Sequence, residues 1–269
     1  MSSRVRIGGI QALADLLRRM GACRSRPMPA GTGLLAWITG RSAAEMSKVI
    51  GGPGYSMPSG GMRVLPMAPG RPGNWILLAG DRWPRIPTRI RVDPGATGNI
   101  LVLGNSTSLP SSVSFQGRDN VAIFGDAITW RFDVDVRFSS DRGCLFMGRA
   151  CSANGTSIIV EGDGRTVTVG DDCMFATGTA VRSSDLHAIS DRGSGRWLNP
   201  PADVLIEPHV WIGQDALVAK GARVGEGSVI GAKSLVTGCV PPHSIAAGVP
   251  ASILRENVEW TRERQPVGA

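Results

Sequence analysis

A six-residue rhythm near the C-terminal end is the feature that most constrains the fold of this chain. An aliphatic set and a small or slim set each advance in steps of six. The aliphatic set is Ile206, Ile212, Val218, Val224, Ile230 and Val236, and the second set is Val210, Ala216, Ala222, Ser228, Ser234 and Val240. Such a repeat predicts a parallel β-helix, in which each unit forms one short strand and a turn and the aliphatic residue fills the coil interior. Chance alternation in an ordinary sheet would follow a period of two.

Glycines follow the repeat at the positions expected for its turns. They are Gly213, Gly225, Gly231 and Gly238. Because glycine accepts backbone angles that are costly for other residues, we interpret these positions as tight turns. The same register recurs upstream at Val169, Phe175 and Val181, so the solenoid is expected to begin well before Ile206.

Segment 183–203 interrupts this register. The spacing from Val181 to Ile206 is not a multiple of six, and the intervening residues are polar and include Gly and Pro. We interpret segment 183–203 as a loop that projects from the solenoid. Insertions in repeat proteins collect on one face and often bind ligands, so this loop is the first candidate for a functional site.

The rest of the chain divides into three parts. Residues 1–90 form an N-terminal region of unknown role, in which the apolar residues between Ile7 and Met20 predict an amphipathic helix. Residues 91–255 are predicted to form the β-helix, with wider or irregular coils in its first half, and residues 256–269 form a C-terminal tail. The expected fold class is therefore mainly β.

Composition narrows the choice of partners. The formal net charge is +7, but the Arg residues are scattered and the chain has one Tyr, so we do not expect nucleic acid as a partner. A basic surface would equally attract an anionic cofactor or a polysaccharide. No apolar run is long enough to span a membrane, and we expect a cytoplasmic protein without membrane insertion. Five Cys without metal-like spacing indicate reduced, mostly buried thiols and no metal site.

Further motifs accompany the repeat in a fixed order. SSDLHAISD precedes it, HVWIG occupies 209–213, and IGAKSLVTGCVPPHSIAAGVPASI occupies 230–253. Over roughly residues 165–255 the chain resembles the hexapeptide-repeat acyltransferases, most of all the bacterial polysaccharide O-acetyltransferases, including those of capsular polysialic acid. The resemblance implies a left-handed β-helix, acetyl-CoA as the donor, a homotrimer, and active sites in clefts between neighbouring solenoids.

The loop contains a candidate general base. Transfer of an acetyl group from a thioester to a sugar hydroxyl requires a base, because a protonated alcohol is a poor nucleophile. His187 lies in the loop, and Asp185 and Asp191 are close enough in sequence that either carboxylate could accept its other ring N–H and fix the tautomer. The matching family position is the catalytic histidine, so the resemblance assigns this role to His187, with Asp185 beside it.

Trp211 is expected to point outward, because its neighbours in the repeat alternate inward. An exposed indole calls for a cover, either a subunit interface or a ligand. The family's matching Trp lies beside the catalytic His in the donor and acceptor cleft, which implies that Trp211 serves both catalysis and donor binding. Asp191, Trp197 and Asn199 could line the acceptor side, although simple loop packing explains them equally well.

Donor binding is expected farther along the repeats. In the family the pantetheine arm follows a groove beside successive coils, where small outward residues and free backbone groups are needed. The residues that meet this need are Gly231, Ala232, Ser234, Ala246 and Gly248. Lys233 and Arg255 are at family-like positions for the coenzyme A phosphates. The alternative is solvated surface charge.

Competing functions make different demands. A γ-class carbonic anhydrase requires three converging histidines, which the spacing of His187, His209 and His243 does not give. A sugar nucleotidyltransferase would need a nucleotide-binding domain ahead of the solenoid, and none is visible. A non-catalytic scaffold would have no reason to keep His187 and Trp211 together. A xenobiotic acetyltransferase shares donor, base and trimer. We therefore expect an acetyl-CoA-dependent O-acetyltransferase that acts on a carbohydrate hydroxyl by direct transfer with a His general base. An O-acetyltransferase of xenobiotics or other small molecules stays open as the alternative, and a non-catalytic scaffold as the second.

Overall fold

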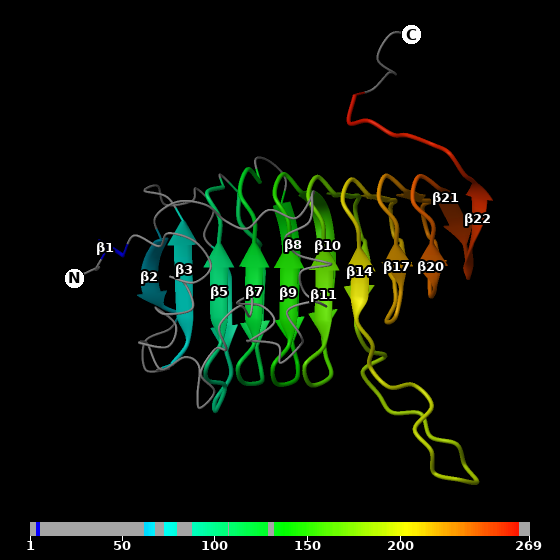
Figure 1. Ribbon diagram of the computed structural model, residues 1–269. Coiled ribbons are helices and arrows are strands. Elements are labelled where there is room, and N and C mark those ends of the chain that lie inside the picture. Colours follow the sequence, from blue (N-terminus) through cyan, green and yellow to red (C-terminus); the bar gives the residue numbers. More distant parts are fainter. Residues whose placement is uncertain are drawn as a thin grey trace, which may run out of the picture.

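Parallel strands stacked into a solenoid make up almost all of the regular structure. The computed structural model describes residues 4–5, 62–67, 73–79, 88–106, 108–128 and 132–263. Every regular element within these ranges is a strand, and the predicted mainly β solenoid is confirmed (Figure 1). The helix predicted between Ile7 and Met20 lies outside the described residues. No helix in the described part of the chain is long and apolar enough to cross a membrane.

One long sheet forms the first face of the solenoid. Its strands are β1 (Arg4–Val5), β2 (Met62–Pro66), β3 (Trp75–Ala79), β5 (Ile100–Leu103), β7 (Val121–Phe124), β9 (Cys144–Met147), β11 (Thr166–Val169), β14 (Val204–Ile206), β17 (Arg223–Val224) and β20 (Cys239–Val240). The first two pairs are antiparallel, and every later pair is parallel. The parallel stack begins at Trp75, inside the region assigned above to 1–90.

The first coils have two strands each, and the later coils have three. In the first coils β4 (Arg89–Val92), β6 (Ser112–Phe115), β8 (Phe132–Phe138) and β10 (Ser152–Val160) lie opposite the first face. The long strand β10 changes the pattern. Its beginning pairs with β12 (Met174–Phe175), and its end pairs with β13 (Ala180–Arg182). Gly155, between these two parts, has a positive φ of 80° that few other residues adopt without strain.

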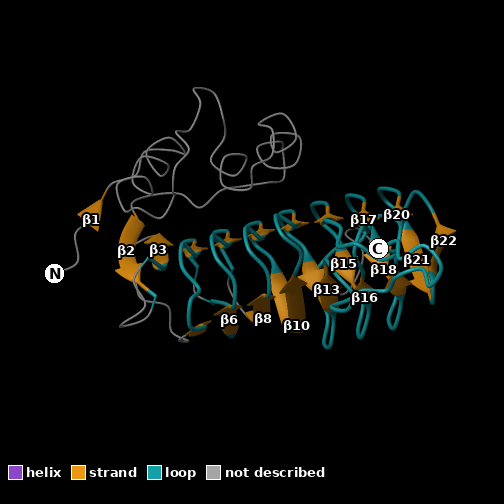
Figure 2. Ribbon diagram, turned by 90° about the horizontal axis from the view of Figure 1, so that it is seen from below, coloured by secondary structure: helices purple, strands orange, loops and turns teal. Residues whose placement is uncertain are grey.

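Beyond β10 the coils have three separate faces (Figure 2). The second face continues through β15 (Trp211–Ile212), β18 (Val229–Ile230) and β21 (Ile245–Gly248), and the third through β16 (Leu217–Val218) and β19 (Leu235–Val236). Strand β22 (Ala251–Arg255) folds back antiparallel on β21 and ends the stack. The expectation of wider coils ahead of the hexapeptide coils is confirmed.

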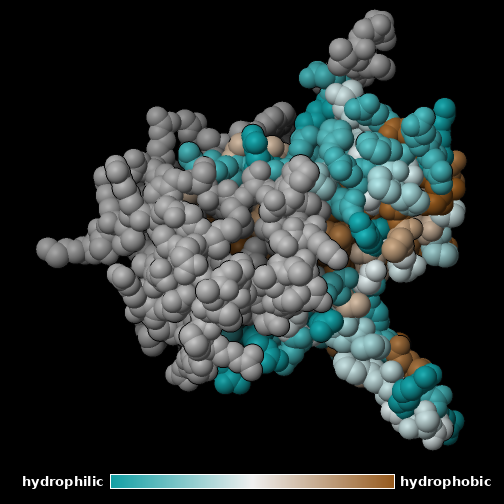
Figure 3. All heavy atoms as spheres, viewed as in Figure 1, coloured by the Kyte–Doolittle hydropathy of each residue, from teal (hydrophilic) through white to brown (hydrophobic). Residues whose placement is uncertain are grey.

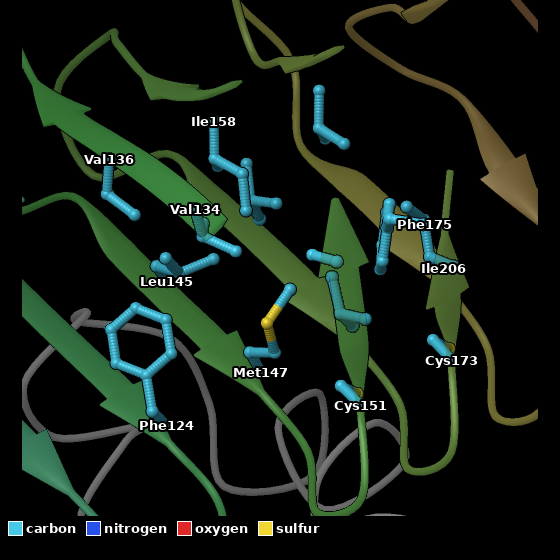
Figure 4. Packing of buried hydrophobic residues seen from close by; sticks show 14 of the residues in the cluster. Phe124, Val134, Val136, Leu145, Met147, Cys151, Ile158, Cys173, Phe175 and Ile206 are labelled. Atoms are coloured by element: carbon cyan, nitrogen blue, oxygen red, sulfur yellow. The ribbon is translucent and has the colours of Figure 1, made fainter. Parts of the chain in front are cut away.

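The interior of the solenoid is one continuous apolar core. All members of the two repeat sets are buried, as predicted, and so are Val169, Phe175 and Val181 upstream. The core of the wide coils contains aromatic rings, including Phe115 stacked on Phe138 with ring centroids 5.0 Å apart. Figure 4 shows the core where the wide coils give way to the hexapeptide coils. Valine, leucine and methionine side chains fill the space between the strands there.

The corners use glycine differently from the prediction. Left-handed backbone at one corner is adopted by Asp172, His209 and His243, which have φ values between 53° and 57°. Gly213 does not lie in that region. A Cβ there would lie 2.5 Å from the main-chain oxygen of Ile230, so glycine is needed because the next coil is too close for a side chain. Around Gly238 no atom lies within 4 Å of such a Cβ, and the structure gives no steric reason for glycine.

The described cysteines are unpaired thiols. Cys144, Cys151 and Cys173 are buried, as predicted for most of them, whereas Cys239 is exposed. Cys23 lies outside the described residues. The Cys173 thiol donates a hydrogen bond to the main-chain oxygen of Glu207 at 3.3 Å, and burial raises its pKa well above the ordinary value.

Candidate functional site

Segment 183–203 leaves the solenoid between β13 and β14 and extends away from it, as predicted (Figure 1). Its two legs pair through main-chain hydrogen bonds, among them Leu198 N–H to the oxygen of Ile189 at 2.8 Å. The side chains of Ile189, Trp197 and Leu198 are 56%, 51% and 48% exposed. Hydrophobic residues therefore lie on the surface of this projection, as Figure 3 shows.

His187 is exposed on the outgoing leg of the loop. Leu186 before it has a φ of 70°, which is uncommon for a residue with a large side chain and is the kind of strain that clusters at functional sites. The main-chain oxygen of His187 accepts a hydrogen bond from Asn199 Nδ2 at 2.9 Å. No described residue of the same chain forms a hydrogen bond with the imidazole ring. The ring is therefore open to a ligand or to a second chain.

The side chain of Asn199 links the two legs of the loop. Its Oδ1 accepts hydrogen bonds from the main-chain N–H of Ile189 at 2.6 Å and from Trp197 Nε1 at 3.0 Å. Its Nδ2 donates to Asp185 Oδ2, as well as to the oxygen of His187, at 2.9 Å each. Asn199 and the indole N–H of Trp197 are thus engaged within the loop. Their assignment to the acceptor side stays a prediction.

Asp185 lies at the base of the loop, where it meets a residue that the sequence analysis did not identify. Lys220 Nζ lies 2.6 Å from Asp185 Oδ2 and donates to the main-chain oxygen of Asn199 at 2.8 Å. The ammonium group of Lys220, followed by the amide of Asn199, lowers the pKa of Asp185 below its ordinary value. The only signal in the sequence is a lysine placed just after a repeat strand that follows the loop.

Asp191 occupies the turn at the far end of the loop. Its Oδ1 accepts hydrogen bonds from the main-chain N–H and the hydroxyl of Ser194 at 2.7 and 2.6 Å. These bonds, the hydroxyl first, lower the pKa of Asp191. Neither Asp185 nor Asp191 forms a hydrogen bond with the ring of His187 in the described chain, so the role of orienting His187 stays a prediction for both.

Trp211 points outward from β15, as predicted, with 38% of its surface exposed. Its own chain covers part of the indole. The ring centroid of Trp260, in the C-terminal tail, lies 6.0 Å from that of Trp211, and the two ring planes are inclined by 49°. Trp211 is on the second face, whereas the loop with His187 leaves the solenoid between the third and first faces. Within the described chain no hydrogen bond or ring contact joins Trp211 to His187.

The tail that brings Trp260 to this place is held by His209. The rings of His209 and Trp260 stack with centroids 4.2 Å apart, and Trp260 Nε1 donates to the main-chain oxygen of His209 at 2.7 Å. The ring nitrogens of His209 lie 2.7 Å from Asp172 Oδ2 and 2.9 Å from the oxygen of Trp260. Farther along the tail, Arg262 Nε donates to Asp172 Oδ1 at 2.7 Å. His209 is therefore engaged in tail docking.

The residues predicted to bind the donor divide into two groups. Ala232, Lys233, Gly248 and Arg255 are exposed, and Gly231 is half-buried. The expectation of an outward position is wrong for Ser234 and Ala246, which are buried inside the coil. For Ser234 it also conflicts with its place in the small inward set of the repeat, which is the prediction that holds. Ser234 Oγ instead accepts a hydrogen bond from Gly248 N at 3.1 Å and holds the turn after β21. In the described part of the chain no group of three His, Cys, Asp or Glu residues could hold a metal ion.

Comparison with known sequences identifies the repeat. A family model described as bacterial transferase hexapeptide (six repeats) matches residues 203–238. Polysialic acid O-acetyltransferase of Escherichia coli O1:K1 is 35% identical over 108 residues, which are 40% of this chain and 35% of that protein. Galactoside O-acetyltransferase of Escherichia coli K12 is 36% identical over 114 residues, or 42% of this chain and 54% of that protein. The chain thus spans about a third and about half of the length of these two relatives.

Solved structures extend the similarity. The crystal structure of a polySia-specific acetyltransferase matches with a TM-score of 0.54 and 30% identity, covering 66% of this chain and 85% of that one. A second crystal structure, of a polysialic acid O-acetyltransferase, matches with a TM-score of 0.56 at 20% identity, which shows a common fold. The chain belongs to the hexapeptide-repeat acyltransferase superfamily and has its left-handed parallel β-helix fold.

Proposed function

We propose that this protein is an acetyl-CoA-dependent O-acetyltransferase that modifies a hydroxyl of a carbohydrate. The observation that carries the proposal is the open imidazole of His187 on a loop that leaves a hexapeptide solenoid. The carbohydrate acceptor is supported by the relatives, whose names specify polysialic acid and galactosides. A small-molecule acceptor is the second candidate, because a chloramphenicol acetyltransferase of Agrobacterium fabrum is 42% identical over 60 residues.

The proposed reaction is a direct transfer. The neutral ring of His187 takes the proton from the acceptor hydroxyl as its oxygen attacks the thioester carbonyl. A backbone N–H or the indole N–H of Trp211 stabilises the oxyanion of the tetrahedral intermediate. When the intermediate collapses, the C–S bond breaks, and the coenzyme A thiolate receives the proton from the imidazolium. The products are the acetyl ester and free coenzyme A, and no acyl-enzyme forms.

We propose that each site is completed by a second copy of the chain, in a homotrimer. Trp211 lies on the second face of the solenoid, whereas the loop with His187 leaves it between the third and first faces. The projecting loop exposes Ile189 and Leu198, which a neighbouring solenoid would cover. Closed rotational symmetry gives every loop the same neighbour, so one interface would complete all sites.

The donor is proposed to lie along the C-terminal coils. Lys233 and Arg255 are exposed cations that suit the coenzyme A phosphates. Gly248, also exposed, offers a position without a side chain where the pantetheine arm could approach the backbone. The buried Ser234 contributes indirectly, because its hydroxyl holds the main chain of Gly248.

The base is tested with His187→Ala. General-base catalysis contributes about 10²- to 10⁴-fold, so turnover should fall by that factor while acetyl-CoA still binds. Arg192→Ala, an exposed change in the same loop, is the matched control and should keep near-parental turnover. Activity is measured with polysialic acid, a galactoside and chloramphenicol as acceptors, which also separates the two candidate functions. Less than about a tenfold loss in His187→Ala would remove the histidine from the mechanism.

The shared site is tested by mixing two inactive chains. Trimers assembled from co-expressed His187→Ala and Trp211→Ala chains contain some clefts in which both residues are intact. Such mixtures should regain activity that neither variant shows alone. If His187 and Trp211 acted within one chain, every cleft would remain defective, and mixing would restore nothing.

A further inference from the structure

One partly buried cation, Lys220, holds both legs of the loop at its base, and we call this arrangement the clamp. Lys220 follows β16 at a corner of the solenoid, and its side chain is 19% exposed. Its two oxygen partners come from different legs of the loop, Asp185 from the outgoing leg and the main chain of Asn199 from the returning leg. A single ammonium group thus joins both legs to the rigid solenoid. Sequence position alone gives no hint of this, because the loop and Lys220 belong to successive coils.

A chain of polar contacts connects Lys220 to the main chain of His187 by way of Asp185 and Asn199. Lys220 holds Asp185, the same Asp185 oxygen accepts a hydrogen bond from Asn199 Nδ2, and Nδ2 also donates to the main chain of His187. Ile189, Trp197 and Leu198 of the loop are exposed in the described chain, so apolar packing does little to hold its outer part. At the base, a main-chain hydrogen bond from Ala202 N–H to the oxygen of Ser183 at 2.9 Å is a second link between the legs. A segment with so little buried surface opens readily unless specific polar contacts fix it.

We propose that Lys220 is a positioning residue, which holds the two legs of the loop so that His187 keeps a fixed place relative to the solenoid. The proposal rests on the proposed function of His187 as the base. Its physical reason is that a displacement of about 1 Å of a reacting group can cost on the order of 10²-fold in rate. Lys220 touches neither acceptor nor donor in this role. Lys233, an exposed lysine at a different corner of the solenoid, between β18 and β19, has no described partner in the loop.

Lys220→Met tests the clamp, because methionine keeps the buried stem and removes the ammonium group. Turnover should fall about 10- to 100-fold, with the Michaelis constant for acetyl-CoA unchanged, because positioning is lost and donor contacts are not. Hydrogen exchange of residues 183–203 should become about tenfold faster or more, as expected when hydrogen bonds to a charged group are removed. The pKa of Asp185, measured by NMR titration, should rise toward its ordinary value.

Two further variants keep the test decisive. Asp185→Asn removes the same ion pair from the loop side without changing the solenoid, and it should also accelerate exchange in the loop. Lys233→Met is the control, and its loop exchange should match that of the parent. Unchanged loop exchange in both Lys220→Met and Asp185→Asn would overturn the proposal. The exchange measurement does not depend on catalysis, so an active His187→Ala variant would refute the proposed base and leave the clamp to be judged separately.

Discussion

The wide coils and the hexapeptide coils of this solenoid solve the same packing problem differently. In the wide part Val121 lies beside Cys144, whereas in the hexapeptide part Ile206 lies beside Val224, only three six-residue units later. The longer coil encloses more space and fills it with rings, so the largest fully buried side chains include Phe115, Phe124 and Phe138. The shorter coil is filled mainly by aliphatic and small residues, with Phe175 as a buried ring in its first turn. The hexapeptide coils therefore have the smaller core, and the exposed candidate site residues lie on their outer surface and on the loop that leaves them.

The polar interior differs in the same way. In the wide coils Asn74, Asn99 and Asn120 are buried one above another and form a ladder. Asn99 Nδ2 donates to Asn74 Oδ1 at 2.8 Å, and Asn120 Nδ2 donates to Asn99 Oδ1 at 3.0 Å. In the hexapeptide coils the buried polar residue is a single small hydroxyl, such as Ser228, which donates to the main-chain oxygen of Pro241. Side-chain ladders thus reinforce the wide coils, and side-chain to backbone bonds the narrow ones.

The largest effect is expected from Phe146→Ala in the wide coils. Phe146 is fully buried, and removal of such a ring typically costs about 3–5 kcal/mol. Ile212→Val, the comparison in a hexapeptide coil, should cost about 0.5–1.5 kcal/mol. Urea denaturation gives both free energies of unfolding. If Ile212→Val proved the more costly change, the expectation that the buried ring of the wide coil contributes more to packing would be wrong.

A smaller effect is expected from Asn99→Ala in the ladder. The change removes Asn99 Oδ1, which accepts hydrogen bonds from both the main-chain N–H and Nδ2 of Asn120, and each buried group left unsatisfied costs about 1–3 kcal/mol. Asn154→Ala is the matched control, because Asn154 is exposed on β10 and its loss should change stability by less than about 0.5 kcal/mol. Equal unfolding free energies for the two variants would show that the ladder adds nothing to the wide coils.

Local periodicity predicted the repetitive half of the molecule well. The inward residues, the projecting loop and the outward Trp211 all follow from a six-residue register that is visible in the sequence. The outward position expected for Ser234 and Ala246 was wrong, because Ser234 belongs to the small inward set and Ala246 pairs with the inward Ile230. A small side chain is compatible with either face, so size alone did not decide its direction.

Contacts between segments that are far apart in the sequence could not be predicted from it. Lys220 meets Asp185 because an inserted loop returns to the coil that follows it. Trp260 meets His209 because the tail folds back along the solenoid. The asparagine ladder has no six-residue period, since each wide coil has its own length. In all three cases coil geometry sets the pairing, and no local pattern encodes it.

The smallest effect on stability is expected from Arg262→Gln, which tests how the tail ties the two halves together. Arg262 donates to Asp172 Oδ1 and to Ser152 Oγ, at 2.7 and 2.9 Å, and thus joins the tail to the coil where the wide part ends. Both partners of the ion pair are partly exposed, with 35% and 42% of their side chains accessible, so the cost should be about 1 kcal/mol or less.

The same change should have a clear local effect. Without Arg262 the end of the tail loses its ion pair, and hydrogen exchange at 258–262 should become faster while the core strands exchange as in the parent. Glu259→Gln, an exposed change in the same tail, should leave the exchange unaltered. If the tail of Arg262→Gln stays fully protected, the stack of Trp260 on His209 and the hydrogen bonds of Trp260 and Val258 hold it without the ion pair. The tail would then be anchored to the hexapeptide coils only, and the two halves of the solenoid would be joined through their shared core and not through the tail.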